Sequence, residues 1–197
     1  MNWIDVPGFW TQCDWQDYEH LINWLPQNGF LIEIGSFRGR SLASVAETIK
    51  RKNLTVWAVD IFDKVISPEY VEPSVYAQRE DMFEDFKDSI NLFGLDSYVT
   101  PMPMTSIDGS IACAANGKSP DMVFIDADHS YEAVIKDIES WTPLVKDGGI
   151  ISGHDYDHNN NSWKGVYRAV HEKFGQPYFG CHIWSVRKSG DTFTTNF

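Results

Sequence analysis

The chain has 197 residues, of which 43% are hydrophobic and 22% are charged, and its formal net charge at pH 7 is −12. This length suits one domain with a sizeable core, so we expect residues 1–197 to form a single globular domain. The acidic balance argues against nucleic acid or an anionic membrane surface as a partner. No apolar run approaches the roughly 18 residues that a membrane span needs.

The cysteine pattern bears on the cellular compartment. Cys13, Cys113 and Cys181 are odd in number, lie far apart and form no C-x-x-C pair. This pattern predicts neither a disulfide framework nor a thiolate zinc site, and a reducing cytoplasm is the expected location. The N-terminus has no basic stretch followed by an apolar one, so no signal peptide is predicted.

Apolar residues recur with helical spacing in some stretches and form short continuous runs in others. The first predicted helix follows Asp14, which we expect to be its N-cap. In chain order the predicted elements are helix 15–25, strand 30–34, helix 40–52, strand 54–59, helix 74–93, strand 98–102, helix 106–116, strand 121–126, helix 130–140, strand 148–152 and helix 163–174.

Two loops and a hairpin complete the predicted chain. Residues 61–73 contain two prolines without periodicity, and residues 153–162 are polar and rich in asparagine. The tail reads as a β-hairpin, with strands over 178–187 and 191–197. Five alternations of strand and helix predict an α/β fold, with a doubly wound, mostly parallel sheet and an antiparallel C-terminal hairpin.

A glycine turn joins the first strand to the second helix. Gly35 and Gly39 are spaced G-x-x-x-G, so the dinucleotide pattern G-x-G-x-x-G is not met. Such a turn still lets the backbone approach a small ligand at a helix N-terminus. Asp60 ends the next strand, where an acid accepts hydrogen bonds from ribose hydroxyls. The alternative for Asp60 is a helix cap or a solvated loop acid.

Acids and histidines follow the fourth and fifth strands. Asp126, Asp128 and His129 come after one strand, and His154 and Asp155 come after the other. If these strands are neighbours, their ends lie about 5 Å apart. Carboxylates that close need a cation or a proton between them, and Mg²⁺, Ca²⁺, Mn²⁺ or a heavier divalent metal fits this chemistry. The alternatives are that Asp128 caps the next helix and that Asp155 is an exposed loop acid.

Several other polar residues have two interpretations each. Ser106 could bind an adenine or serve as an ordinary N-cap, and Arg38 and Arg40 could contact a carboxylate or a neighbouring helix. The remaining histidines have no acidic company and are expected to be structural: His20, His158, His171 and His182.

Four stretches together resemble a known family. They are Glu-Ile-Gly-Ser-Phe-Arg-Gly-Arg-Ser at 33–41, Ala-Val-Asp at 58–60, Phe-Ile-Asp-Ala-Asp-His-Ser-Tyr-Glu at 124–132 and Gly-Gly-Ile-Ile-Ser-Gly-His-Asp-Tyr at 148–156. The chain resembles class I S-adenosylmethionine-dependent methyltransferases over about residues 30–187. It is most similar to the small branch akin to macrocin-type sugar O-methyltransferases. The resemblance implies a Rossmann-like sheet of the class I type.

The resemblance also implies roles for individual residues. Asp126 and Asp155 would hold Mg²⁺ or another divalent cation, with His154 standing where well-known members have an acid. Asp128 matches the proposed general base, and His129 and His154 are the other catalytic candidates. The residues expected to bind S-adenosylmethionine are Glu33, Gly35, Ser36, Gly39, Ser41, Asp60, Ser106 and Asp126.

The expected function is therefore O-methyl transfer to a hydroxyl of a sugar or another small polyol, assisted by a divalent cation. One alternative is a metal-free methyltransferase with a histidine as its base. A second is a nucleotide-binding oxidoreductase, which the glycine spacing disfavours, and a third is a non-catalytic cofactor-binding relative. The expected partner is a small-molecule hydroxyl acceptor, and the oligomeric state stays open.

Overall fold

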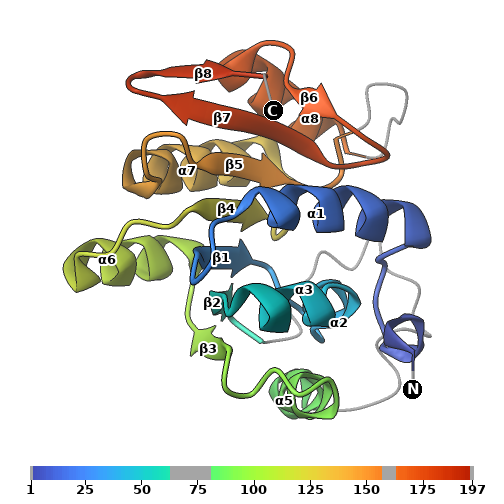
Figure 1. Cartoon of the computed structure of the whole chain (residues 1–197). Helices are drawn as coiled ribbons and strands as arrows, with labels where there is room; N and C mark the ends of the chain where they lie inside the picture. The colour runs from blue at the N-terminus through green and yellow to red at the C-terminus, as the bar shows by residue number, and fades with distance from the viewer. Residues whose placement is uncertain (1, 63–80, 157–162, 196–197) are drawn as a thin grey trace.

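The computed structural model describes residues 2–62, 81–156 and 163–195. Its strands are β1 (Phe30–Ile34), β2 (Thr55–Asp60), β3 (Val99–Pro103), β4 (Met122–Ile125), β5 (Ile150–Gly153), β6 (Tyr178–Phe179), β7 (Trp184–Ser189) and β8 (Thr192–Thr194). In this part of the chain they form one eight-stranded sheet in the order β3-β2-β1-β4-β5-β7-β6, with β8 beside β7 (Figure 1).

The first five strands run parallel, and the last three join antiparallel at one edge. The expectation of a doubly wound, mostly parallel sheet with a C-terminal antiparallel hairpin is confirmed. After β3 the chain returns to the middle of the sheet and continues with β4 on the other side of β1, so the strand order reverses between β1 and β4. In open α/β sheets, ligands bind at such a switch point, beyond the carboxyl ends of the strands.

Helices cover both faces of the sheet. They are α1 (Gln12–Trp24), α2 (Arg40–Ser44), α3 (Ala46–Lys52), α5 (Met82–Leu92), α6 (Ser106–Asn116), α7 (Tyr131–Trp141) and α8 (Lys164–Phe174), with short 3₁₀ turns η1 (Trp3–Asp5) and η2 (Thr142–Leu144). One core lies under α1, α2, α3 and α5, and the other lies under α6, α7 and α8.

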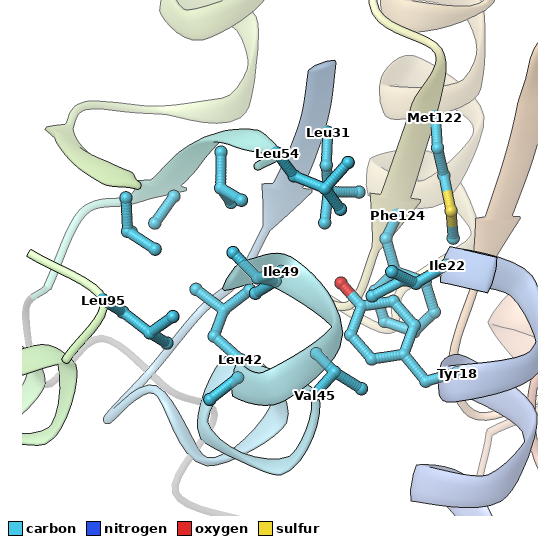
Figure 2. Close-up of a cluster of buried hydrophobic side chains, with 14 of the residues drawn as sticks. Tyr18, Ile22, Leu31, Leu42, Val45, Ile49, Leu54, Leu95, Met122 and Phe124 are labelled. Carbon is cyan, nitrogen blue, oxygen red and sulfur yellow. The ribbon is translucent and has the colours of Figure 1, made fainter. Parts of the chain in front are cut away.

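The strands supply both cores because their side chains alternate between the faces. In β1, Leu31 belongs to the first core, whereas Ile32 and Ile34 belong to the second. Figure 2 shows the first core, where Tyr18 of α1 packs beside Phe124 of β4, with ring centroids 4.5 Å apart. Glu33 shares the face of Leu31, so its carboxylate points into this buried layer.

Two predicted elements differ from the observed ones, and a third is only partly described. The helix expected over 40–52 breaks into α2 and α3 at Val45, whose backbone leaves the helical region (φ −112°, ψ 15°). The strand expected over 178–187 is divided, because a turn closed by Gly180 N–H on Ile183 O separates β6 from β7. Of the helix expected over 74–93, the part before residue 81 and most of the preceding loop lie outside the described residues.

The predicted N-cap of the first helix is wrong. Thr11 is the N-cap of α1, and Asp14 is the third helical residue of a reciprocal capping box. The Thr-x-x-Asp spacing is the sequence signature of that box. Asp14 is fully buried, so its carboxylate needs further partners inside the protein.

The expectation that the chain has no disulfide is also wrong. Cys13 of α1 and Cys181 of the turn before β7 are bonded, with Cα atoms 5.9 Å apart and a separation of 168 positions in the sequence. Cys113 is a buried free thiol. The spacing gave no signal because the pairing depends on how α1 docks on a distant turn.

Within the described residues, the helices are too short or too polar to cross a membrane.

Candidate active site

The ends of β4 and β5 bring the predicted acidic residues together. Ile125 pairs with Gly153 in parallel register, so the residues that follow leave the same edge of the sheet. His154 Nδ1 lies 3.6 Å from Asp126 Oδ1 and 3.4 Å from Asp155 Oδ2. One ligand atom from each of these three residues lies within 4.8 Å of the other two. The cluster offers two carboxylates and one imidazole to a cation.

His129 joins the cluster from the start of the loop after β4. Its Nε2 lies 2.6 Å from Asp155 Oδ2 and 3.8 Å from Asp126 Oδ1. Its ring packs on Trp163 with centroids 4.1 Å apart. Burial lowers the pKa of His129, but the two carboxylates outweigh burial and raise this pKa to about 9. His129 therefore carries a positive charge at neutral pH.

His154 is held between carboxylates on both of its edges. Its Nε2 lies 3.3 Å from Asp14 Oδ1, on the side opposite Asp126 and Asp155. Burial lowers the pKa of His154, yet the acids, Asp126 above all, lift it well above its ordinary value. Burial alone would raise the pKa of Asp155, but His129 and His154 hold it well below its usual range. The cluster thus contains two imidazolium ions among three carboxylates.

Asp14 and His182 are site residues that the sequence patterns did not reveal. Asp14 Oδ2 accepts hydrogen bonds from Thr11 N at 2.8 Å and from Thr11 Oγ1 at 2.6 Å. Asp14 Oδ1 faces His182 Nδ1 at 2.9 Å as well as His154. His182 was expected to be structural. Its contact with Asp14 depends on the tertiary position of α1, which no local pattern reports.

The glycine turn lies directly against the end of β4. Gly35 has φ +85°, and a Cβ there would stand 2.0 Å from the carbonyl oxygen of Asp126. Gly35 is therefore required by the close approach of two backbones as well as by its φ. Gly39 has φ +80° at the N-cap of α2. The turn and the acidic cluster thus share one rim of the sheet.

Glu33 is a buried acid at the end of β1. Its carboxylate accepts hydrogen bonds from Tyr18 OH at 2.8 Å and from Ser41 Oγ at 2.9 Å. Burial raises the pKa of Glu33 to about 7, against the hydrogen bonds from Tyr18 and Ser41 that lower it. The hydrogen bond from Ser41 places the start of α2 beside Glu33, next to the Gly35 turn.

Asp60 closes the same turn from β2. Its Oδ2 accepts the amide of Phe37 at 2.8 Å, and its Oδ1 accepts the amide of Phe62 at 2.7 Å. Burial raises the pKa of Asp60, and the hydrogen bonds from these amides oppose the rise. Asp60 is therefore neither a helix cap nor a solvated acid. Each oxygen still has a lone pair for a further donor.

Four other predicted residues have structural partners. Asp128 is exposed, and its Oδ1 accepts the amide of Ser130 at 2.7 Å, while Ser130 itself is the N-cap of α7. Ser106 Oγ accepts Trp141 Nε1–H at 2.9 Å; the N-cap of α6 is Thr105. Arg38 has the expected kind of partner, because it pairs with Asp85 of α5 at 3.1 Å. Arg40 donates to the backbone carbonyls of Gly8 and of Ile4 in η1 and has no carboxylate partner among these contacts.

The remaining histidines lie apart from the cluster or outside the described residues. His20 accepts a hydrogen bond from Trp24 at 3.3 Å, and His171 stacks on Tyr167 with centroids 5.6 Å apart. His158 lies outside the described residues.

Comparison with known proteins agrees with this arrangement. Residues 32–156 match the model of a family described as a methyltransferase domain. An uncharacterized protein, R132, of Acanthamoeba polyphaga mimivirus is 30% identical over 129 residues, which are 64% of this chain and 50% of that protein. The chain therefore spans about half the length of this relative.

Two solved O-methyltransferases share the fold. TomG from Streptomyces achromogenes, involved in tomaymycin synthesis and solved with S-adenosylmethionine, has a TM-score of 0.62 and 16% identity, covering 89% of this chain and 80% of TomG. CalS11, a TDP-rhamnose 3′-O-methyltransferase in calicheamicin biosynthesis, has a TM-score of 0.60 and 15% identity, covering 90% and 78% of the two chains.

The matched range runs from the middle of β1 to the residues just after β5, so it contains the glycine turn and both acidic strand ends. It covers well over half of the chain. The chain therefore belongs to the methyltransferase domain family, and its fold is that of the S-adenosylmethionine-dependent methyltransferases.

Proposed function

We propose that this chain transfers a methyl group from S-adenosylmethionine to a hydroxyl of a small molecule, with the aid of a divalent cation. The observation that carries the proposal is the convergence of Asp126, His154 and Asp155 directly beside the Gly35 turn. A sugar or another polyol is the proposed acceptor class. The shared fold with a sugar O-methyltransferase supports this choice.

The proposed cofactor site surrounds the ends of β1 and β2. The bare backbone at Gly35 and Gly39 admits a ligand at the N-terminus of α2. The free lone pairs of Asp60 can accept ribose hydroxyls. The hydroxyl of Ser106 already accepts a hydrogen bond from Trp141. The full proposed set is Glu33, Gly35, Ser36, Gly39, Ser41, Asp60, Ser106 and Asp126.

The proposed cation ligands are Asp126, Asp155 and His154. Two carboxylate oxygens and one imidazole nitrogen form a donor set that suits Mn²⁺ or another first-row metal as well as Mg²⁺. A bound cation would lower the pKa of the acceptor hydroxyl and help to fix its position.

The proposed general base is Asp128. Its carboxylate is exposed, two residues after Asp126. As the acceptor oxygen bonds to the methyl carbon and the carbon–sulfur bond breaks, the hydroxyl proton passes to Asp128. The products are the methyl ether and S-adenosylhomocysteine. His129 and His154 are the alternative bases, but each carries a proton in the observed arrangement and must lose it first.

One observation favours a second, metal-free version of the same reaction. His129 and His154 neutralise Asp126 and Asp155 through contacts of 2.6 to 3.8 Å. The acids therefore have counter-charges of their own. In that version His129 or His154, once it has lost its proton, is the only base, and turnover survives EDTA.

Calorimetric titration tests the cofactor first. We expect S-adenosylmethionine to bind with a sub-millimolar Kd, and absence of binding would overturn the proposal. A panel of sugars and nucleotide sugars then tests transfer, and cofactor binding without transfer to any acceptor would support a non-catalytic role.

EDTA should abolish turnover, and Mn²⁺ or Mg²⁺ should restore it. Replacing Asp128 with Asn should lower kcat by about 100- to 10,000-fold without changing cofactor affinity.

We retain the small-molecule acceptor over nucleic acid or a membrane as a proposal, because the net charge is −12. The extent of the domain, residues 1–197, and a cytoplasmic location also stay predictions. The Cys13–Cys181 bond weakens the ground for a cytoplasmic location, since disulfides persist mainly in oxidising compartments. Mass spectrometry of protein alkylated at cell lysis will show whether the bond is present in the cell.

A further inference from the structure

His154 presents its two ring nitrogens to different carboxylates. Nδ1 faces Asp126 and Asp155, the proposed cation ligands, at 3.6 and 3.4 Å. Nε2 faces the other way, 3.3 Å from Asp14 Oδ1. A neutral imidazole holds one proton, so the nitrogen that donates a hydrogen bond determines which nitrogen can bind a metal.

We propose that Asp14 is a positioning residue for the cation site: it keeps the proton on Nε2 of His154, so that Nδ1, which faces Asp126 and Asp155, is the nitrogen that gives up its proton to a cation. This inference rests on the proposed metal-assisted function. Histidines that bind metals commonly donate their other N–H to a carboxylate, which fixes the tautomer and the ring orientation. Asp14 would be that carboxylate, although it comes from α1, far from the motifs that supply the ligands.

The surroundings of Asp14 leave one oxygen for this role. Its side chain is fully buried, and Oδ2 is taken by the amide and the hydroxyl of Thr11. Oδ1 therefore serves the two imidazoles, with His182 Nδ1 at 2.9 Å and His154 Nε2 at 3.3 Å. His182, at the surface end of this chain of contacts, holds the Asp14 oxygen from the side opposite His154.

The position of α1 is itself fixed next to these contacts. Cys13 and Cys181, which form the disulfide, directly precede Asp14 and His182. Asp17, one helical turn further along α1, accepts the amide of Cys181. The disulfide and the Asp17 hydrogen bond thus fix α1 on either side of Asp14 in the sequence. A group that orients a metal ligand needs such a fixed position.

A merely structural role for Asp14 can be separated with a matched control. Asp108 of α6 occupies the same place in the same Thr-x-x-Asp motif, with Thr105 Oγ1 donating to Asp108 Oδ2 at 2.7 Å and Asp108 N donating to Thr105 Oγ1 at 3.1 Å. Asp108 is exposed on the other face of the sheet. Replacing Asp108 with Asn removes the carboxylate of this Thr-x-x-Asp motif without touching the cluster.

The experiment titrates Mn²⁺ into the metal-free wild-type, Asp14→Asn and Asp108→Asn proteins, with S-adenosylmethionine binding and circular dichroism measured in parallel. We expect Asp14→Asn to weaken Mn²⁺ binding by about 10- to 100-fold, and Asp108→Asn to leave it unchanged. Cofactor affinity should stay the same in all three. Equal Mn²⁺ affinity in Asp14→Asn and the wild type would overturn the inference and leave the proposed function standing.

A second measurement needs no variant, so misfolding of Asp14→Asn cannot obscure the result. Long-range ¹H–¹⁵N spectra of the wild-type protein loaded with diamagnetic Zn²⁺ identify which nitrogen of His154 is protonated. We expect a protonated Nε2 and a metal-bound Nδ1; the opposite assignment would overturn the inference. If neither Mn²⁺ nor Zn²⁺ binds the wild-type protein, the metal-assisted function fails and the inference fails with it.

Discussion

At the scale of single residues, Gly35 couples the proposed cofactor site to the proposed cation site. Its amide donates to Val59 O at 2.8 Å, and its Cα faces the backbone of Asp126. One residue thus sets the spacing of three strand ends: those of β1, β2 and β4. The absence of a side chain there is a structural requirement, whatever ligand occupies the turn.

A substitution at Gly35 should therefore be costly. In Gly35→Ala the new Cβ would meet Asp126 O at 2.0 Å, in addition to the strain of φ +85°. We expect a loss of more than about 3 kcal/mol in the free energy of unfolding, because a backbone atom cannot move aside as a side chain can. Urea denaturation measures the loss.

Gly117 supplies the control for this prediction. It has φ +70° with no atom within 4 Å of a built Cβ. Gly117→Ala should cost only about 1–2 kcal/mol, the penalty for the left-handed conformation itself. Similar losses in the two variants would show that the contact with Asp126 contributes nothing.

At the scale of elements, α7 combines an apolar face with a buried acid. Val134, Ile138 and Trp141 are buried on this helix together with Asp137. Burial raises the pKa of Asp137 to about 6, a hydrogen bond from Ser106 lowers it, and the charge of Asp128 raises it further. Asp137 therefore interacts both with Ser106 at the start of α6 and, through charge, with the proposed base Asp128.

This raised pKa predicts a pH-dependent stability. The folded-state pKa of Asp137 lies above the ordinary value of 3.8, so the folded protein favours the neutral acid. The contribution of Asp137 to the free energy of unfolding is therefore fully present below pH 3.8 and is lost as the pH rises through about 6. Asn mimics the neutral acid. Relative to the wild type, Asp137→Asn should gain about 3 kcal/mol of unfolding free energy between about pH 4 and about pH 7.

Chemical denaturation at several pH values measures this difference. Glu132→Gln is the control, since Glu132 lies on the same helix but is exposed. Its difference from the wild type should vary little with pH. An Asp137→Asn difference that is flat across the same range would contradict the prediction.

The elements themselves were largely readable from the sequence. Apolar runs such as 121–126 identified the buried parallel strands, and parallel pairing then required Asp126 and Asp155 to share an edge. Asp14 and His182 were not readable, because their contact depends on the angle at which α1 crosses the sheet. Local periodicity locates a helix and its buried face, and it says nothing about which distant turn meets its first residues.

At the scale of the whole molecule, the disulfide ties α1 to the turn before β7. Cys13 and Cys181 are 168 residues apart, so the bond closes most of the described chain into a loop. Cross-linking a loop of this length restricts the unfolded chain strongly, and the model of chain entropy puts the effect at the upper end of the usual 2–5 kcal/mol.

The double variant Cys13→Ser/Cys181→Ser should therefore lose about 2–5 kcal/mol of unfolding free energy. Wild-type protein unfolded in a reducing agent should show the same loss. Cys113→Ala leaves the bond intact. The reducing agent should therefore lower its free energy of unfolding by the same amount as in the wild type. A double variant as stable as the oxidised wild type would show that the bond adds nothing to stability.

The link between α1 and the turn at Cys181 has a consequence for biosynthesis. As the nascent chain leaves the ribosome, α1 emerges long before its covalent and hydrogen-bonded partners. The parallel strands can assemble on the growing chain while Asp14 still lacks His182. The acidic cluster is therefore completed only after the turn at Cys181 has been synthesised, and a chain that stops before this turn would carry the parallel strands without the finished cluster.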